Sequence, residues 1–226
     1  MNVTIFGDSY SAGENNHGIS YANYLRQEKN IHVRNLAISG STMGEYSIFP
    51  TDGNSLLSMI KNNIVAVKEA DVIILQYGLN DAVACAAGNT NLSTVLISFI
   101  KALDLIKQIN ANCKVLFLAV APPKSLLAEC LAENIHEYLA NVYLKDFSFF
   151  HYIEALDIFD YYNNIVSNIC RGACYFYEYM FDTNFRGRDL ISDDGIHPSD
   201  DGHRCISESL IDALNLIDAL KTITNF

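Results

Sequence analysis

Two kinds of apolar pattern alternate along the chain. Short apolar runs rich in β-branched and aromatic residues predict strands at 3–6, 32–37, 71–76 and 114–120. Between them, apolar residues recur every three or four positions, the period of an amphipathic helix. These segments predict helices at 20–27, 54–70, 92–109 and 126–143. The same patterns predict a fifth strand at 149–156 and a closing helix at 200–220.

Strands that alternate with long helices require right-handed crossovers onto a parallel sheet that is covered on both faces. The sequence therefore predicts an α/β fold, a three-layer α/β/α sandwich with a central, mostly parallel five-stranded sheet. A length of 226 residues suits one such domain, and we expect a single domain over 1–226. Residues 11–18 are small and polar and predict a loop, and 161–188 are less regular.

The charge of the chain narrows the range of partners. The formal net charge is −11 and the pI is about 4.8, so the surface repels phosphate backbones and anionic lipid head groups. We expect no nucleic-acid partner. No apolar stretch is long enough to span a bilayer, and no signal peptide precedes Ser9, so a cytoplasmic location is expected.

The six cysteines are spread along the chain without the paired spacing of a metal knuckle. We therefore expect reduced, mostly buried thiols, no metal site and no cofactor. Cys170 and Cys174, four positions apart, leave a disulfide open as an alternative.

Candidate chemistry gathers where the strands end. Ser9, Gly40 and Asn80 each follow a predicted strand, within a loop that contains glycine, and such loops meet at one edge of a parallel sheet. Acyl transfer needs a nucleophilic hydroxyl and donors for the oxyanion that forms. Ser9 can supply the hydroxyl and a backbone N–H, Gly40 a second N–H, and Asn80 an amide. Gly7, with no Cβ, is expected to permit a sharp turn before the serine.

The strongest candidate for the base lies near the other end of the chain, at His197. Asp194, three residues earlier in a turn that contains glycine, is placed to orient its imidazole. Asp193 competes for that role, although the spacing favours Asp194. Pro198 restricts His197 to extended conformations and helps to hold the loop.

Four blocks of the sequence carry a family resemblance. They are Gly7-Asp8-Ser9, Gly40, Gly78-Leu79-Asn80-Asp81 and Asp194-Gly195-Ile196-His197. In order and separation they resemble the blocks of the SGNH/GDSL hydrolase superfamily, over nearly the whole chain. The resemblance implies a flavodoxin-like sandwich in which Ser9, Asp194 and His197 form a catalytic triad. It implies Ser9, Gly40 and Asn80 as the oxyanion hole.

The expected function is that of a cofactor-free serine hydrolase acting on a small-molecule ester, such as an acylated sugar, lipid or metabolite. An O-acyltransferase that uses the same triad to pass the acyl group to an alcohol is the alternative, because both share the acyl-enzyme step. A nucleotide- or phosphate-binding module is disfavoured, because neither glycine-rich phosphate motif is present. Tyr10 departs from the leucine that many members of the superfamily carry, and we expect it to shape an apolar wall.

Three further features have two interpretations each. His17 follows Ser9 closely and either contacts substrate or is solvated. His203, near the start of the last helix, is expected to pack or to cap. The aromatic stretch 175–181 is either a lid or substrate wall, or part of the core.

Overall fold

Four parallel strands form the sheet of the computed structural model, in the order β2-β1-β3-β4. The strands are β1 (Asn2–Gly7), β2 (His32–Asn35), β3 (Val72–Gln76) and β4 (Lys114–Phe117). The structure describes residues 1–45, 54–118, 192–194 and 197–224. The predicted helix 126–143, the predicted strand 149–156, the aromatic stretch 175–181, and Cys130, Cys170 and Cys174 lie outside these residues.

Burial explains the order of the strands. Every residue of β3 is buried, as its unbroken apolar run requires for a strand between two neighbours and between two helical layers. In β2, exposed and half-buried residues alternate, which fits its place at the edge of the described sheet. In β1, Ile5 pairs with Asn35 on one side and with Ile74 on the other.

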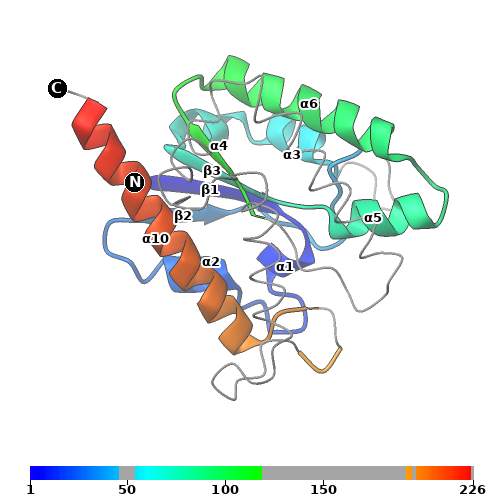
Figure 1. Cartoon of the computed structure of the whole chain (residues 1–226), viewed down its shortest axis with the longest axis horizontal. Helices are drawn as coiled ribbons and strands as arrows, with labels where there is room; N and C mark the ends of the chain where they lie inside the picture. The colour runs from blue at the N-terminus through cyan, green and yellow to red at the C-terminus, as the bar shows by residue number, and fades with distance from the viewer. Residues whose placement is uncertain (46–53, 119–191, 195–196, 225–226) are drawn as a thin grey trace, which may run out of the picture.

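Helices cover both faces of the sheet (Figure 1). On one side, α2 (Tyr21–Leu25) packs against the long C-terminal helix α10 (Asp200–Thr224). On the other side lie α3 (Leu56–Asn62), α4 (Ile64–Glu69) and α6 (Leu92–Ile109). The expected three-layer α/β/α arrangement with a parallel sheet is therefore present in the described part of the chain.

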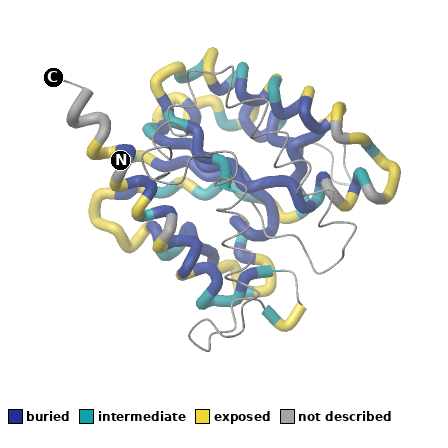
Figure 2. The backbone as a smooth tube through the Cα atoms, in the orientation of Figure 1, coloured by how far each residue is buried: buried dark blue, intermediate teal, exposed yellow. Residues whose placement is uncertain are grey.

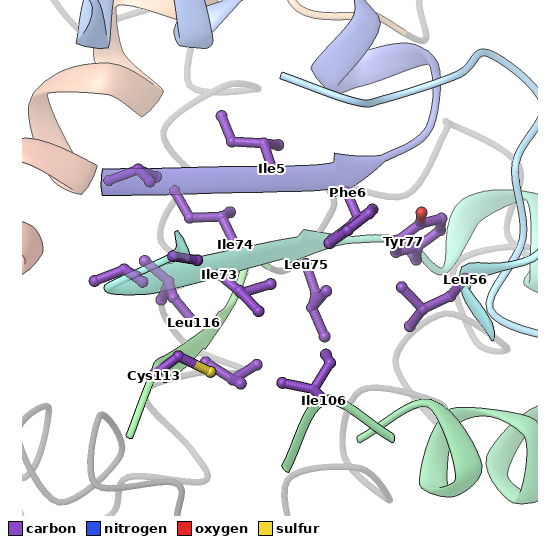
Figure 3. Packing of buried hydrophobic residues seen from close by; sticks show 14 of the residues in the cluster. Ile5, Phe6, Leu56, Ile73, Ile74, Leu75, Tyr77, Ile106, Cys113 and Leu116 are labelled. Carbon is purple, nitrogen blue, oxygen red and sulfur yellow. The ribbon is translucent and has the colours of Figure 1, made fainter. Parts of the chain in front are cut away.

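The apolar core lies between these layers. Figure 3 shows Ile5 and Phe6 of β1 beside Ile73, Ile74 and Leu75 of β3. Each of these five side chains is almost fully removed from water. In Figure 2 the buried segments follow β1 and β3 and the inward faces of the helices, with exposed residues in the outer loops and on the outer helix faces. Burial of this apolar surface is the main term that stabilises the fold.

Several elements differ from the prediction. The helix expected over 54–70 is two helices, α3 and α4, because Asn63 leaves the helical conformation (φ −128°, ψ 38°). Its side-chain amide donates to the carbonyl of Met59, a local bond by which asparagine competes with the helical backbone.

Two short helices were not predicted. The first, α1 (Ser9–Ala12), replaces the beginning of the loop expected over 11–18, and the second, α5 (Leu79–Ala86), directly follows β3. Both begin at the carboxyl end of a strand, where they position the candidate site residues. Among the helices of the described ranges, none is both long and apolar enough to cross a membrane.

Candidate active site

Ser9 is the first residue of α1, at the carboxyl end of β1. Asp8 caps the helix: its carboxylate accepts a hydrogen bond from the backbone N–H of Tyr10 at 3.1 Å. The Ser9 N–H lies in the first turn, where backbone donors have no partner within the helix. Ser9 is 9% exposed, so its hydroxyl lies at the boundary between the core and the surface.

Gly7 is required for space. A Cβ built on it would lie 2.4 Å from Ser11 Oγ and 2.7 Å from Ser11 Cβ. Its φ lies outside the positive region, so the missing Cβ, as expected, and not a left-handed backbone is what this position requires. The absence of a side chain lets the first turn of α1 fold back against the end of β1.

A buried hydrogen-bond network joins α1 to β3 and α2. Gln76, the last residue of β3, accepts through Oε1 from the Ser11 N–H at 3.1 Å and from Ser11 Oγ at 2.7 Å. The hydroxyl of Tyr21 lies 2.5 Å from Ser11 Oγ. Because the Ser11 hydrogen points to Gln76, the Tyr21 hydroxyl is the donor of that bond. The segment that carries Ser9 is therefore fastened to the sheet by fully buried polar groups.

The second half of the site is the turn that precedes α10. The Asp194 carboxylate accepts from His197 Nδ1 at 2.5 Å, from the His197 N–H at 3.0 Å and from Ser192 Oγ at 2.7 Å. The Ser192 N–H also donates to the His197 carbonyl at 2.8 Å, which closes the turn. These bonds to His197 and Ser192 are made by Asp194. Its competitor for the orienting role, Asp193, is the exposed residue next to it.

The two halves meet between Ser9 and His197, which are 188 positions apart. His197 Nε2 lies 2.9 Å from Ser9 Oγ. A carboxylate only accepts, so Nδ1 carries the ring proton toward Asp194 and the lone pair of Nε2 faces the serine hydroxyl. This arrangement can remove the proton of Ser9 and stabilise the imidazolium that results. The Tyr10 ring, buried, packs against the imidazole with the two centroids 5.5 Å apart.

The loops that contain Gly40 and Asn80 are joined at the same edge of the sheet. Asn80 lies in the first turn of α5. Its Nδ2 donates a hydrogen bond, 2.9 Å long, to the carbonyl of Ser41, the residue that follows Gly40. Gly40 has a φ of +80°, a conformation that glycine adopts freely. One N–H of the Asn80 amide thus fixes the side chain beside the Gly40 loop.

Asp81 strengthens the same connection. Its carboxylate accepts from the backbone N–H groups of Met43 and Gly44, both at 3.0 Å, and the carboxylate is fully buried. Ile38, earlier in the Gly40 loop, donates its N–H to the Gly7 carbonyl at 3.0 Å, and Asp8 donates its N–H to the Gln76 carbonyl at 3.2 Å. The loops after β1, β2 and β3 are therefore bonded to one another.

Burial shifts two titrations close to the site. It raises the pKa of the Asp8 carboxyl to about 7, and the N–H of Tyr10 and the amide of Gln76 oppose the shift in part. It lowers the pKa of His203 to about 4. His203 packs near the Tyr21 ring, and neither ring nitrogen has a hydrogen-bond partner among the described residues. His203 is thus the packing residue that its position suggested.

The remaining candidates are placed as follows. His17 is exposed and has a positive φ of 54°. Cys85, Cys113 and Cys205 lie outside any disulfide, and Cys113 and Cys205 are buried. Within the described ranges, no three His, Cys, Asp or Glu side chains are grouped as a metal site would require.

Some residues of the site carried no recognised signal in the sequence. Gln76 was a polar residue at the end of an apolar strand, which is a pattern that could have marked it. Asn15, whose amide donates to Asp194, is 179 positions away from its partner, and no local pattern relates the two.

Comparison with known proteins identifies the family of the chain. The sequence model of the GDSL-like lipase/acylhydrolase family matches residues 5–205. No curated protein matches the chain in a sequence search.

Solved structures resemble the whole fold at low identity. The lipase Lip_vut3 from a goat rumen metagenome is 16% identical, with a TM-score of 0.61 over 94% of this chain and 97% of that one. TesA is 15% identical, with a TM-score of 0.62 over 96% and 99%. The acetyl xylan esterase AlAXEase is 16% identical, with a TM-score of 0.60 over 94% and 99%. With the family match over most of its length, the chain belongs to the GDSL-like lipase/acylhydrolase family, a family of carboxylic ester hydrolases.

Proposed function

We propose that the chain cleaves a carboxylic ester of a small molecule through an acyl-enzyme on Ser9. His197 takes the serine proton as Oγ attacks the carbonyl carbon, and it returns that proton to the leaving alcohol. Water, deprotonated by the same imidazole, then releases the acid and restores Ser9. Asp194 holds the ring in the tautomer that leaves Nε2 free to accept.

The observation that supports this proposal is the continuous hydrogen-bonded chain from Asp194 through His197 to Ser9, with distances of 2.5 Å and 2.9 Å. A serine that only caps or packs does not need an imidazole at 2.9 Å. A histidine that only packs does not need a carboxylate on its other nitrogen.

The oxyanion hole of the proposal comprises the N–H groups of Ser9 and Gly40 and the amide of Asn80. Its support is the bond from Asn80 to the Ser41 carbonyl, which holds the amide beside the Gly40 loop. Donors that are fixed before the reaction begins stabilise the developing negative charge without reorganisation.

A fluorophosphonate probe tests the nucleophile. It should label Ser9 of the parent chain, as located by peptide mass analysis, and it should not label a folded Ser9→Ala variant. Hydrolysis of p-nitrophenyl acetate should fall by more than about 10⁴-fold in that variant, because no other group replaces the attacking hydroxyl. A Ser9→Ala chain that kept the parental rate would falsify the proposal.

Esters of graded acyl length then define the substrate. The similar structures are named as a lipase and an acetyl xylan esterase, so the panel should extend from acetylated sugars to medium-chain lipids. Product analysis with and without an acceptor alcohol distinguishes hydrolysis, which yields the free acid, from transfer to that alcohol.

A further inference from the structure

The side chain of Asn15 lies against the Asp194–His197 pair. Its Nδ2 donates a hydrogen bond to Asp194 Oδ2, the same oxygen that accepts from His197 Nδ1. Nδ2 also lies 3.3 Å from His197 Nδ1. Since Nδ1 carries its proton toward Asp194, the two nitrogens are not bonded to each other, and both donate to one oxygen.

These bonds are part of a set of hydrogen bonds to both oxygens of the carboxylate. Asp194 Oδ1 accepts from Ser192 Oγ and from the His197 N–H, and Oδ2 accepts from His197 and Asn15. A carboxylate oxygen has two lone-pair directions, and each oxygen accepts from the two donors named here. Among these donors from the described residues, the Asn15 amide comes from the other half of the site, whereas Ser192 and His197 belong to the turn of Asp194.

The loop that carries Asn15 is attached to the helix of the nucleophile. The N–H groups of Gly13 and Glu14 both donate to the Ser9 carbonyl at 3.0 Å. The next turn is closed by the bond from the Gly18 N–H to the Gly13 carbonyl at 3.1 Å. Asn15 has a positive φ of 57°, a conformation that asparagine tolerates better than most residues. The backbone therefore holds the amide at a fixed place relative to Ser9.

We propose that Asn15 is a positioning residue that fixes the Asp194–His197 pair relative to Ser9; this inference rests on the proposed function. The amide connects the loop after the nucleophile directly to the carboxylate that orients the base. Without it, Asp194 loses a donor from the loop that follows Ser9, while the donors from Ser192 and His197, in its own turn, remain.

A water molecule can replace the Asn15 amide as a hydrogen-bond donor, but it cannot fix the position of the carboxylate. Asn15, Ser192 and Asp194 line a polar hollow of about 460 Å³, and the Asp194 side chain is 26% exposed. A water molecule in place of the amide would satisfy Oδ2 without fixing its direction. The loss therefore affects the rate more than the free energy of unfolding.

The test compares Asn15→Gly with His17→Gly in the full chain. Glycine removes the side chain and keeps the positive φ at either position, and His17 (φ 54°) is exposed in the same loop. We expect kcat on p-nitrophenyl acetate to fall about tenfold in Asn15→Gly, with KM within about twofold, because a bond to a charged group is lost. His17→Gly should change the stability of the loop to a similar extent and leave the pH dependence of kcat/KM unmoved.

The pH dependence of kcat/KM distinguishes positioning from a merely structural role. Removing a donor from the carboxylate strengthens its attraction for the protonated imidazole, so the acidic limb moves to higher pH. Asn15→Asp places a second carboxylate there and should move the limb further in the same direction. Tyr10 of α1 and His203 of α10 also interact with the pair electrostatically, and neither is altered by these variants.

The Nδ1 proton of His197 gives a readout without turnover. Its far-downfield proton resonance should broaden in Asn15→Gly through faster exchange with water. A folded Asn15→Gly chain with parental kcat, an unmoved acidic limb and an equally sharp resonance would overturn the inference. A parent chain that neither bound the fluorophosphonate at Ser9 nor hydrolysed esters would refute the proposed function instead, and the resonance would still decide the role of Asn15.

Discussion

The two halves of the hydrogen-bonded series Ser9–His197–Asp194 are held in place by different kinds of contact. Ser9 belongs to a segment that is bonded into the core: Asp8, Ser11, Tyr21 and Gln76 beneath it are all buried. Asp194, by contrast, is held by hydrogen bonds at the surface, and its side chain is 26% exposed. One half is supported by the sheet, and the other by the bonds within its own turn and by Asn15.

This difference separates stability from activity. A buried polar group that loses its partner costs about 1–3 kcal/mol, whereas an exposed one regains water. Changes around Ser9 are therefore expected to lower the free energy of unfolding. Changes around Asp194 are expected to lower the rate and leave the fold nearly as stable.

Apart from removal of the nucleophile itself, the largest expected effect is in the exposed half. Asp194→Asn should lower kcat about 10³–10⁴-fold, because an amide does not hold the imidazole in the required tautomer. The free energy of unfolding should change by less than about 1 kcal/mol, since the site is open to water. Kinetics on p-nitrophenyl acetate and urea unfolding measure the two quantities.

Asp193→Asn is the matched control for that variant. Asp193 is the exposed neighbour of Asp194 and carries the same charge. Its kcat should stay within about twofold of the parental value, as for most surface substitutions. A large loss in Asp193→Asn with little loss in Asp194→Asn would reverse the assignment of the orienting carboxylate.

A smaller effect, on stability, is expected in the buried half. Gly7→Ala should lower the free energy of unfolding by about 1–3 kcal/mol, because the new methyl group overlaps the side chain of Ser11. Ser11→Gly in the same chain removes the overlapping atoms and should recover part of the loss. Urea unfolding of the single and double variants checks this; a Gly7→Ala chain as stable as the parent would show that the end of β1 can move.

The smallest effect is the net pH dependence of the parent's stability, because two buried groups contribute to it with opposite sign. The pKa of His203 falls from 6.5 to about 4 on folding, so its unfolded state binds the extra proton between these values and stability is lost as pH falls. The pKa of Asp8 rises from 3.8 to about 7, so its folded state binds the extra proton and stability is lost as pH rises. Between pH 4 and 6.5 the two contributions nearly cancel.

Removing either group should leave the pH dependence of stability that the other group contributes. Asp8→Asn retains a good helix cap, and its free energy of unfolding should rise with pH, relative to the parent, by about 1.4 kcal/mol per unit between pH 4.5 and 6.5. His203→Leu should show the opposite slope over the same interval. Urea unfolding at three pH values measures both; parallel curves for parent and variants would mean that neither group keeps its shifted pKa in the folded chain.

Much of the fold could be predicted from the local pattern. The helix over 92–109 has the predicted bounds, and the strands of the described residues lie where the short apolar runs are. These elements are long or strongly apolar, so burial alone selects them. The helices α1 and α5 were not predicted, because each is too short to show a clear apolar period. Asp8 caps α1 through its side chain, whereas α5 begins at Gly78 without a side-chain cap bond. Asn63 divides one expected helix in two through a single side-chain bond.

The site residues were predicted by motif, and the roles assigned to them stay predictions until the kinetic tests are made. Ser9, Gly40, Asn80, Asp194 and His197 stand in blocks whose letters can be read directly. Gln76 and Asn15 could not be predicted in this way. Each matters through a partner more than sixty positions away, and the sequence carries no local trace of such a pairing.

The order of apolar and polar residues thus determined that this chain forms a parallel α/β sandwich and which residues follow its strands. Periodicity and burial act over a few residues, so they can be read along the chain. Only the tertiary structure decided that the serine is fastened into the core, that its histidine and aspartate are fastened at the surface, and that Asn15 joins the two. Hydrogen bonds between distant segments depend on where the packed sheet and helices bring them, and that placement exists only once the chain has folded.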